Sequence, residues 1–256
     1  MADTPSASLG DSFKNFFEIV PALDDELVND VFFIRHEVYA RDLGFEPVRE
    51  DQRETDKYDR HSLHCLVRTS QHPARLAGCA RLILPDPLQP AAPLPFEIYC
   101  EHSLDRSLMD PAQLPRDRIA EVSRLAVMSG FRRRKGEQGR EALVTEQDFG
   151  DARQPRFPYI PISLYMGAVL MAKRMGIDYL FTLTEPRLAG HFAKLGVNIR
   201  PIGAPVDHRG LRVPSVIEVA EIPERVRAMI RPLWTTIESQ MMAVYALQAP
   251  SGAQEA

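Results

Sequence analysis

The sequence has few of the residues that mark disulfide-rich or metal-dependent proteins. It contains three cysteines in 256 residues, Cys65, Cys79 and Cys100, and none of them stands at CxxC spacing. An odd number of cysteines without a pairing pattern predicts reduced thiols in the cytosol and argues against a zinc site. Free cysteine packs as a small apolar side chain, so we expect half-buried structural thiols and no metal ion.

Long hydrophobic runs and an excess of one charge are also missing. Residues 1–11 are polar, without a basic start or an apolar stretch, so we expect no secretion signal and a cytoplasmic location. The most apolar region, residues 160–171, is interrupted by Ser163, Tyr165 and Gly167 and is too short to span a bilayer. The formal net charge of -4 argues against general nucleic-acid binding.

The composition that remains is that of a packed domain. Hydrophobic residues make up 45% of the chain, which is enough for a core, and the length suits one large domain. The ends, residues 1–11 and 247–256, are rich in small and polar residues and are predicted to be disordered tails. We therefore expect a single domain over residues 12–246, with residues 85–95 as a proline-rich surface loop.

Hydrophobic periodicity predicts helices that alternate with strands. A helix begins near Asp24, where acidic residues favour a helix N-terminus, and ends near Gly44, while residues 49–60 are too charged for a core. The other predicted helices are 158–175, 186–195 (closed by Gly196) and 222–246, and the predicted strands are 63–67, 76–84, 119–128, 178–184 and 213–220. This order predicts an α/β (α+β) domain with a mixed sheet flanked by helices.

Three carboxylates, Glu54, Asp56 and Asp59, lie within six residues just before the first predicted strand. Such a segment is either a solvated loop or a site that holds an ammonium group or anchors buried arginines. Arg81 interrupts an apolar strand, a costly position unless its charge is paired, faces a cavity or lies at an edge.

A second charged strand contains Glu121, Ser123 and Arg124. Strand alternation predicts Glu121 and Ser123 on one face and Arg124 on the other. Arg81 and Arg124 could both pair with the carboxylates of residues 54–59, which would explain how buried charges are tolerated.

The segment that follows, residues 132–140, has five basic residues in nine positions: Arg132, Arg133, Arg134, Lys135 and Arg140. With Gly136 and Gly139 it could bind phosphate, or it could meet an acidic carrier protein. A solvated loop is the alternative.

Taken in order, Arg35, Glu54-x-Asp56-x-x-Asp59, Arg81 and Glu121-x-x-Arg124 resemble the signature of acyl-homoserine-lactone (autoinducer) synthases. The resemblance covers roughly residues 30–130. It implies a GNAT-like acyl-CoA N-acyltransferase fold and an acyl-carrier protein as the acyl donor.

The rest of the chain is similar to N-acyl amino acid synthases and to acyltransferases associated with PEP-CTERM/exosortase systems. Residues 179–197 look like the GNAT strand and helix that end in "LGF". Phe45 stands where the lactone synthases have tryptophan, which argues against S-adenosylmethionine as a substrate. Residues 132–157 lack the compact glycine-rich loop that binds coenzyme A, which favours a carrier-protein donor, with acyl-CoA as an alternative.

The resemblance implies amide formation by aminolysis of a thioester, and the attacking amine must lose a proton. Glu121 is the first candidate for the base and Glu54 the second, while backbone N–H groups near residues 125–127 would stabilise the oxyanion. The residues expected to shape the substrate pocket are Arg35, Phe45, Asp56, Asp59, Arg81, Ser123 and Arg124. Apolar residues of the 158–175 helix are candidates for the acyl tunnel.

We thus expect an enzyme without a tightly bound cofactor that acylates a small amine, with an amino acid as the favoured acceptor. The basic residues Arg132, Arg133, Arg134 and Lys135 would contact the carrier protein or its phosphopantetheine. A lipid product could bring the protein to a membrane surface. The alternatives are an autoinducer synthase that uses S-adenosylmethionine, a coenzyme A-dependent acetyltransferase and a non-catalytic acyl-binding module.

Overall fold

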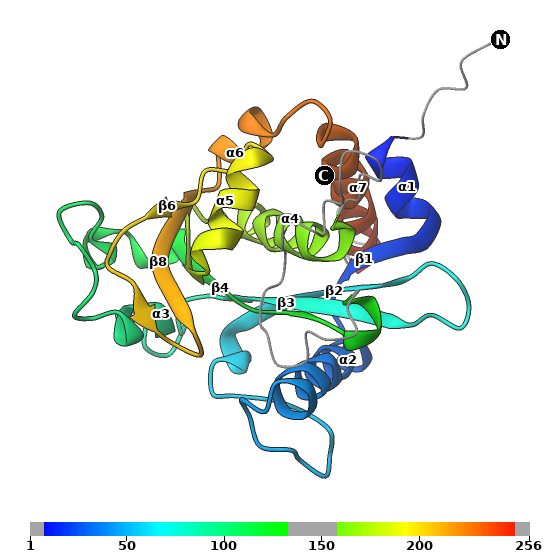
Figure 1. The fold of residues 1–256 in the computed structure, drawn as a ribbon, viewed down its shortest axis with the longest axis horizontal. Coiled ribbons are helices and arrows are strands. Elements are labelled where there is room, and N and C mark those ends of the chain that lie inside the picture. The colour runs from blue at the N-terminus through cyan, green and yellow to red at the C-terminus, as the bar shows by residue number, and fades with distance from the viewer. Residues whose placement is uncertain (1–7, 133–157, 249–256) are drawn as a thin grey trace, which may run out of the picture.

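A computed structural model describes residues 8–132 and 158–248 of the protein (Figure 1). The helices are α1 (Leu9–Phe16), α2 (Asp25–Arg35), the π-helix η1 (His36–Asp42), α3 (Pro95–Tyr99), α4 (Tyr159–Arg174), α5 (Pro186–Lys194), α6 (Glu221–Arg225) and α7 (Arg231–Gln248). The strands are β1 (Phe17–Pro21), β2 (Ser62–Thr69), β3 (Leu76–Ile83), β4 (Ile119–Val127), β5 (Tyr179–Thr184), β6 (Arg200–Pro201), β7 (Val206–Asp207) and β8 (Leu211–Glu218). Short 3-10 turns occupy several of the connections.

The strands form one mixed sheet in the order β1-β2-β3-β4-β5-β8-β6, and β7 pairs with β8. Every pairing is antiparallel except the one between β4 and β5. This arrangement confirms the predicted α/β class with a mixed sheet between helices.

Helices cover both faces of the sheet (Figure 1). Helices α4, α7 and α1 lie on one face, and α2 with η1 lies on the other. Helix α4 is buried from Ile160 to Ala172, as expected for a helix that is apolar all round. Gly167 allows its close approach to the sheet, because a Cβ there would lie 2.7 Å from Ile19 Cδ1 and 2.9 Å from Cys65 Sγ.

Helix α2 begins where the sequence predicts. The Asp24 carboxylate caps it by accepting a hydrogen bond of 2.8 Å from the backbone N–H of Leu27. The helix continues into η1, whose wider turn is typical of functional positions. Gly44, with φ of +66°, then turns the chain away from the helix.

The chain ends differ from the prediction in three places. Residues 8–11, predicted to belong to a tail, start α1, because the Ser8 side chain caps its N-terminus. The 222–246 helix is two helices, α6 and α7, since the chain leaves helical geometry at Val226. Residues 17–21, for which we predicted no element, form the edge strand β1 beside β2. Pro21 is tolerated because it lies at the end of this edge strand.

None of the helices within residues 8–132 and 158–248 combines the length and the apolar character needed to cross a membrane.

Candidate active site

A pocket of about 660 Å³ opens where β4 and β5 diverge. The two parallel strands pair only from Ile119 to Glu121 on β4, and residues 122–125 of β4 and 182–184 of β5 then line the pocket. Further parts of the wall come from helices α3, α4 and α5, from η1, from Arg81 of β3, from the loop of residues 56–58 and from the β7–β8 hairpin. The carboxyl end of a splayed parallel pair is a common position for a ligand in α/β proteins.

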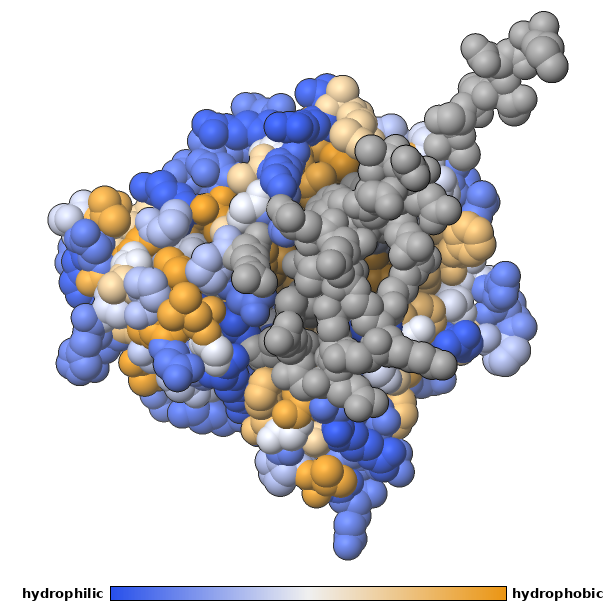
Figure 2. Space-filling model, in the orientation of Figure 1, coloured by the Kyte–Doolittle hydropathy of each residue, from blue (hydrophilic) through white to orange (hydrophobic). Residues whose placement is uncertain are grey.

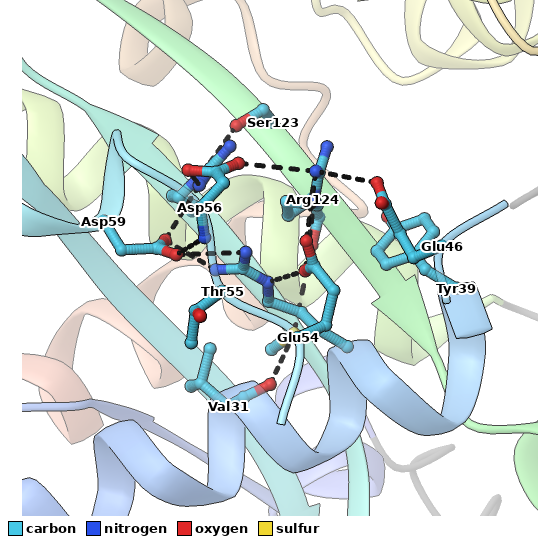
Figure 3. Close-up of polar contacts among 12 residues, drawn as sticks. Val31, Tyr39, Glu46, Glu54, Thr55, Asp56, Asp59, Ser123 and Arg124 are labelled. Carbon is cyan, nitrogen blue, oxygen red and sulfur yellow. Dashed lines mark hydrogen bonds and ion pairs between the residues drawn. The ribbon is translucent and has the colours of Figure 1, made fainter. Parts of the chain in front are cut away.

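A closed ring of ion pairs lies beside this pocket (Figure 3). Its members, in order around the ring, are Arg35, Glu54, Arg124, Asp56, Arg81 and Asp59. Arg35 is completely buried, and its guanidinium donates to Glu54 through Nε and to Asp59 through Nη1, the latter at 2.6 Å. We call these six residues the ion-pair ring.

The other half of the ring joins β3 and β4 to the loop between η1 and β2. Arg81 Nη1 contacts Asp56 Oδ1 at 2.7 Å and Asp59 Oδ1 at 2.8 Å, while its Nε donates to the Ser123 hydroxyl at 3.0 Å. Arg124 Nη2 contacts Asp56 Oδ2 at 3.3 Å and Glu54 Oε1 at 3.2 Å. Three guanidinium groups and three carboxylates thus balance one another, which explains how these charges can be buried.

The loop of residues 49–60 is more deeply buried than its composition predicts. We expected it to be too charged for the core, yet Glu54 is only 5% exposed. The backbone N–H of Glu54 donates to the Phe32 carbonyl, and Asp56 and Asp59 fold the loop through hydrogen bonds to backbone N–H groups. The charges are buried because each finds an arginine, a pairing that composition alone does not reveal.

Arg124 reaches the ring because β4 contains a bulge. Cys79 pairs with Ala126 and Arg81 pairs with Ser123, so two residues of β4 oppose the single Ala80. Arg124 has a left-handed backbone, with φ of +51°. The prediction that Arg124 faces away from Glu121 and Ser123 is therefore wrong, since the bulge breaks the alternation and turns Arg124 toward the carboxylates that Arg81 also contacts.

The ring keeps two of its carboxylates, Glu54 and Asp59, ionised. Burial alone would raise the pKa of Asp59, but hydrogen bonds from Arg35 and the nearby Arg81 charge hold it at about 2. Burial likewise opposes ionisation of Glu54, yet Arg35 and Arg124 bring its pKa below the ordinary value. Glu54 is therefore a poor proton acceptor near neutral pH.

Glu121 lies outside the ring and behaves in the opposite way. It lines the pocket, and its Oε2 accepts a hydrogen bond of 2.8 Å from the backbone N–H of Phe96 at the start of α3. Burial raises the pKa of Glu121 to about 7, and the Phe96 hydrogen bond and the charges of Arg81 and Arg124 only partly offset that rise. A carboxylate with this pKa can gain and lose a proton near neutral pH.

Three further pocket residues were not singled out from the sequence. The Tyr39 hydroxyl on η1 donates to the Leu125 carbonyl at 3.1 Å, and Arg124 Cζ lies 5.4 Å from the Tyr39 ring centroid. Glu46 accepts from Arg124 at 3.3 Å and from Arg209 at 2.5 Å. The contact between Arg209 and Glu46 could have been predicted only from a sequence motif that contains both of these distant residues.

Phe45 and the basic segment are placed only in part. Phe45 packs against the core beneath α2, 5.5 Å from Arg209 Cζ, and it is not part of the pocket wall in the described residues. Arg132 lines the pocket and pairs with Asp42 at 2.5 Å. Arg133, Arg134 and Lys135, predicted for carrier-protein contact, lie outside the described residues.

One arm of the pocket is apolar. Tyr165 of α4 and Phe192 of α5 line it, with ring centroids 4.3 Å apart, and Leu188 and Ile199 extend the wall. Tyr165 is the one α4 residue among those that line the pocket, so most of the predicted apolar stripe of residues 158–175 is core.

Within the described residues, no three His, Cys, Asp or Glu side chains are grouped so as to hold a metal ion. All three cysteines are free and buried.

Comparison with known proteins is consistent with this geometry. Residues 34–140 match a family described as an acetyltransferase (GNAT) domain. A search of curated proteins found no match.

Among solved structures, TofI in a ternary complex with an inhibitor and MTA has a TM-score of 0.56 and 21% identity, covering 83% of this chain and 96% of that one. BjaI, a CoA-dependent acyl-homoserine lactone synthase with SAM and isopentyl-CoA, has a TM-score of 0.56 and 17% identity, covering 88% and 89%. FeeM, an N-acyl amino acid synthase from uncultured soil microbes, has a TM-score of 0.50 and 13% identity, covering 82% and 95%.

These likenesses establish the GNAT-like fold, and the domain match supports the prediction that the chain is an acyltransferase enzyme.

Proposed function

We propose that this protein is an N-acyltransferase that moves a fatty-acyl group from an acyl-carrier-protein thioester to the amine of a small acceptor, an amino acid. The observation that carries the proposal is Glu121, a buried carboxylate with a pKa of about 7 that faces a pocket at the splay of β4 and β5. Thioester aminolysis needs a proton acceptor of this kind.

A single base can carry out the proton transfers that the reaction needs. An ammonium group must lose a proton to become a nucleophile, and Glu121, in its ionised form, would take that proton directly or through a water molecule. The free amine then attacks the thioester carbonyl carbon, and the second amine proton leaves as the amide forms. Protonated Glu121 would donate the proton it already holds to the departing thiolate, take up the second amine proton and release it to solvent before the next turnover.

The tetrahedral intermediate carries negative charge on the former carbonyl oxygen. Beyond Glu121, β4 has no partner in β5, so its backbone faces the pocket over residues 122–125. Backbone N–H groups near residues 125–127 are our candidates for stabilising this oxyanion. The Tyr39 hydroxyl, bonded to the Leu125 carbonyl, would hold that stretch in place.

The ion-pair ring serves this chemistry as a scaffold. Its charges are mutually compensated, so we assign Arg35, Asp56, Asp59, Arg81 and Arg124 to shaping the acceptor pocket without moving protons. Ser123 fixes Arg81 through a hydrogen bond. Glu54 is less suited than Glu121 to the role of base, because its pKa is lowered.

The apolar arm beside Tyr165 and Phe192 suits a fatty-acyl chain, because burial of each methylene is favourable by about 0.8 kcal/mol. Arg132 at the pocket wall, with Arg133, Arg134 and Lys135 after it in sequence, favours an acidic carrier protein or its phosphopantetheine as the donor. Acyl-CoA is the competing donor, because three of the similar structures are described as CoA-dependent synthases.

The second candidate is an acyl-homoserine-lactone synthase that uses S-adenosylmethionine. The fold similarity to BjaI, a structure described with SAM, favours it, while the similarity to FeeM, described as an N-acyl amino acid synthase, favours the first candidate. The position of Phe45 outside the pocket wall means that it does not decide between them.

The test is a panel assay with purified protein. Medium- and long-chain acyl-carrier proteins and the matching acyl-CoA thioesters are each incubated with a mixture of amino acids or with S-adenosylmethionine, and products are identified by mass spectrometry. We expect an N-acyl amino acid from the carrier-protein donors. A homoserine lactone would select the second candidate, and absence of any acyl amide would overturn both. Mass spectrometry of lipids from an expressing host would show whether an N-acylated lipid product accumulates.

A further inference from the structure

The Glu121 carboxylate depends on a short helix for its hydrogen bond. Among the described residues its one hydrogen-bond donor is the backbone N–H of Phe96, which lies 2.8 Å from Oε2. Phe96 belongs to α3, a helix of five residues, and a helix of that length is not stable without packing partners. The contacts that hold α3 in place therefore also hold the donor on Glu121.

Aromatic packing holds one part of α3. Phe96 is completely buried, and its ring stacks on the Phe181 ring with centroids 4.5 Å apart. Phe181 is the β5 residue that pairs with Glu121 of β4. Other side chains of the helix are open to solvent: Ile98 and Tyr99 are exposed, and Figure 2 shows apolar side chains at the surface in the region of α3 and β8. Burial thus secures only part of the helix.

An ion pair between Glu97 and Arg116 joins α3 to the segment that leads into β4. Arg116 Nη1 donates to Glu97 Oε1 at 3.1 Å and Nη2 donates to Oε2 at 2.8 Å, a two-point contact of the kind that makes guanidinium–carboxylate pairs strong. Nη2 also donates to the Ala92 carbonyl at 2.8 Å, and Glu97 Oε2 accepts from the Leu94 N–H at 2.7 Å. The pair, which we call the α3 clamp, therefore fixes the chain before α3 as well as the helix.

The two segments are joined at two adjacent places. Arg116 begins a 3-10 turn, and β4 with Glu121 follows that turn directly. Glu97 follows Phe96 in α3. One segment thus holds Arg116 and Glu121, and the other holds their partners, Glu97 and the Phe96 N–H. Glu97 and Arg116 are not part of the described pocket wall, so any effect they have on the reaction must pass through α3 and β4.

We propose that Glu97 and Arg116 are positioning residues for Glu121, and that their ion pair clamps α3 so that the Phe96 N–H stays on the Glu121 carboxylate. The proposal rests on the proposed function, in which Glu121 takes the proton of the amine. A base that accepts and returns a proton in each turnover needs a donor of fixed position for its ionised form. The α3 clamp supplies that fixed position without adding a charge to the pocket wall.

The charged and titratable groups that act on Glu121 come from three elements. They are Arg81 of β3, Arg124 of β4, and Glu97 and Cys100 of α3 and its C-terminal cap. Burial raises the pKa of Glu121 most; the two arginines lower it and the Glu97 charge raises it further. The thiol, whose own pKa is raised by burial, is uncharged near pH 7. Of these charges, that of Glu97 is the one that Arg116 balances.

Loss of the α3 clamp should therefore change Glu121 in one direction. Without Arg116 the helix can draw the Phe96 N–H away from Glu121, and the Glu97 carboxylate keeps an uncompensated charge. Both changes favour the protonated form of Glu121. Its pKa should move upward by about one pH unit, the size expected for loss of one hydrogen bond to a charged group.

The experiment measures the titration of Glu121 in Arg116→Met. Protein labelled with carbon-13 at the glutamate carboxyl groups is titrated by NMR, and Glu121→Gln identifies the Glu121 signal. The pH profile of kcat/KM is measured in parallel with the donor and acceptor that wild type uses. We expect both midpoints to move upward together. Arg118→Met is the matched control and should leave both midpoints in place, because Arg118 stands in the same turn but contacts Asp178 and the Gly176 carbonyl instead.

A double variant separates position from charge. In Glu97→Met combined with Arg116→Met the clamp is lost, but both charges of the pair leave together. A direct charge effect predicts a Glu121 pKa at or below the wild-type value, because the Glu97 charge that raised it is gone. Loss of the Phe96 hydrogen bond predicts a rise. Apolar replacement of a whole ion pair is well tolerated, so the double variant should fold even if Arg116→Met, with Glu97 left unpaired, does not.

Circular dichroism and urea unfolding check that the variants fold. Folded variants in which Glu121 titrates as in wild type would overturn the proposal. So would a lower midpoint in the double variant, which would leave a charge effect alone, or an equal rise in Arg118→Met, which would make the effect unspecific.

Failure of the proposed function has a different signature. Either wild type forms no amide from any donor and acceptor, or the NMR midpoint of Glu121 moves in Arg116→Met while the midpoint of kcat/KM does not follow. In both cases the NMR titration, which needs no turnover, still decides whether the α3 clamp positions the donor of Glu121.

Discussion

Glu54 and Glu121 are buried to the same extent, each only 5% exposed, but their surroundings drive their pKa values in opposite directions. Glu54 lies between Arg35 and Arg124, which lower its pKa despite burial. Glu121 has one backbone N–H partner, and burial raises its pKa to about 7. Two carboxylates separated in this way are suited to two tasks, one structural and one in proton transfer.

The comparison also shows what neutralises a buried charge. Around Glu54 the compensation comes from guanidinium groups in direct contact, and the group stays ionised. Around Glu121 the nearest guanidinium groups are already paired with Asp56, Asp59 and Glu54, so their influence on it is small relative to burial. Because the arginines of the ring are already paired with ring carboxylates, they do not force Glu121 to stay ionised.

The sharpest way to break the comparison is Glu121→Gln. The change removes the proposed proton acceptor while keeping the shape and the capacity to accept from Phe96 N–H, so kcat should fall about 10²- to 10⁴-fold. The measurement is steady-state amide formation at saturating acceptor. The matched control, Glu218→Gln, alters an acid that lies outside the pocket wall and should retain activity. Retained turnover in Glu121→Gln would move the base elsewhere.

Arg35→Met tests the structural half of the comparison. The substitution leaves Glu54 and Asp59 buried with fewer cationic partners, so the free energy of unfolding should fall by about 3–5 kcal/mol. Urea unfolding followed by circular dichroism measures it. Arg41→Met, in an exposed pair with Glu37 one helical turn away, should change stability by about 0.5 kcal/mol or less. A similar small change in both variants would show that the ring contributes little.

Glu121 and the ion-pair ring should make the free energy of unfolding depend on pH in opposite directions. The pKa of Glu121 is higher in the folded protein than its ordinary 4.5, so its contribution is fully present below pH 4.5 and declines as pH rises toward 7. The full decline would be roughly 3 kcal/mol. The pKa of Asp59 is depressed from 3.8 to about 2, so its contribution is lost as pH falls through that window.

Urea midpoints measured across these pH ranges check both signs. Glu121→Gln should flatten the decline between pH 4.5 and 7 and leave the acid limb unchanged. If Glu121 is the base, kcat/KM of the wild-type enzyme should rise with pH through about 7, because kcat/KM follows ionisation of the free enzyme. A wild-type stability curve that is flat over this range would contradict the raised pKa.

The smallest expected effect is that of Tyr39→Phe. The variant loses the hydrogen bond to the Leu125 carbonyl but keeps the ring beside Arg124, so stability should fall by about 1 kcal/mol and kcat severalfold. Tyr245→Phe, on α7 and outside the pocket wall, is the control for loss of a tyrosine hydroxyl. Unchanged kcat in Tyr39→Phe would mean that the bulged strand needs no such support.

Sequence reasoning located most of the secondary structure because the relevant signals are local. Asp24 caps α2 as expected, and Gly196, with φ of +92°, ends α5 where a glycine was expected to close it. The C-terminal helix was predicted as one, although Pro232, the second residue of α7, is a residue type that favours the first turn of a new helix.

The site was harder to predict, because its geometry depends on contacts between distant segments. The pairing of Arg81 and Arg124 with residues 54–59 was proposed from the sequence and is confirmed. The predicted strand face of Arg124 was wrong, because an alternating pattern of residues does not reveal a bulge. The Arg209–Glu46 contact joins residues 163 positions apart, and nothing local to either residue indicates it.

The bulge in β4 has a consequence for how this strand can change. Because two residues there oppose Ala80 alone, removal of one of them would leave a regular ladder in which Ala126 still pairs with Cys79 and Val127 with Gly78. Ala126 and Val127 would therefore keep their places on opposite faces of the sheet. A regular strand would, however, return to alternation at this point, and β4 would no longer direct an Arg124 side chain to Glu54 and Asp56. The extra residue of β4 thus serves the ion-pair ring and not the packing of the helices on the sheet.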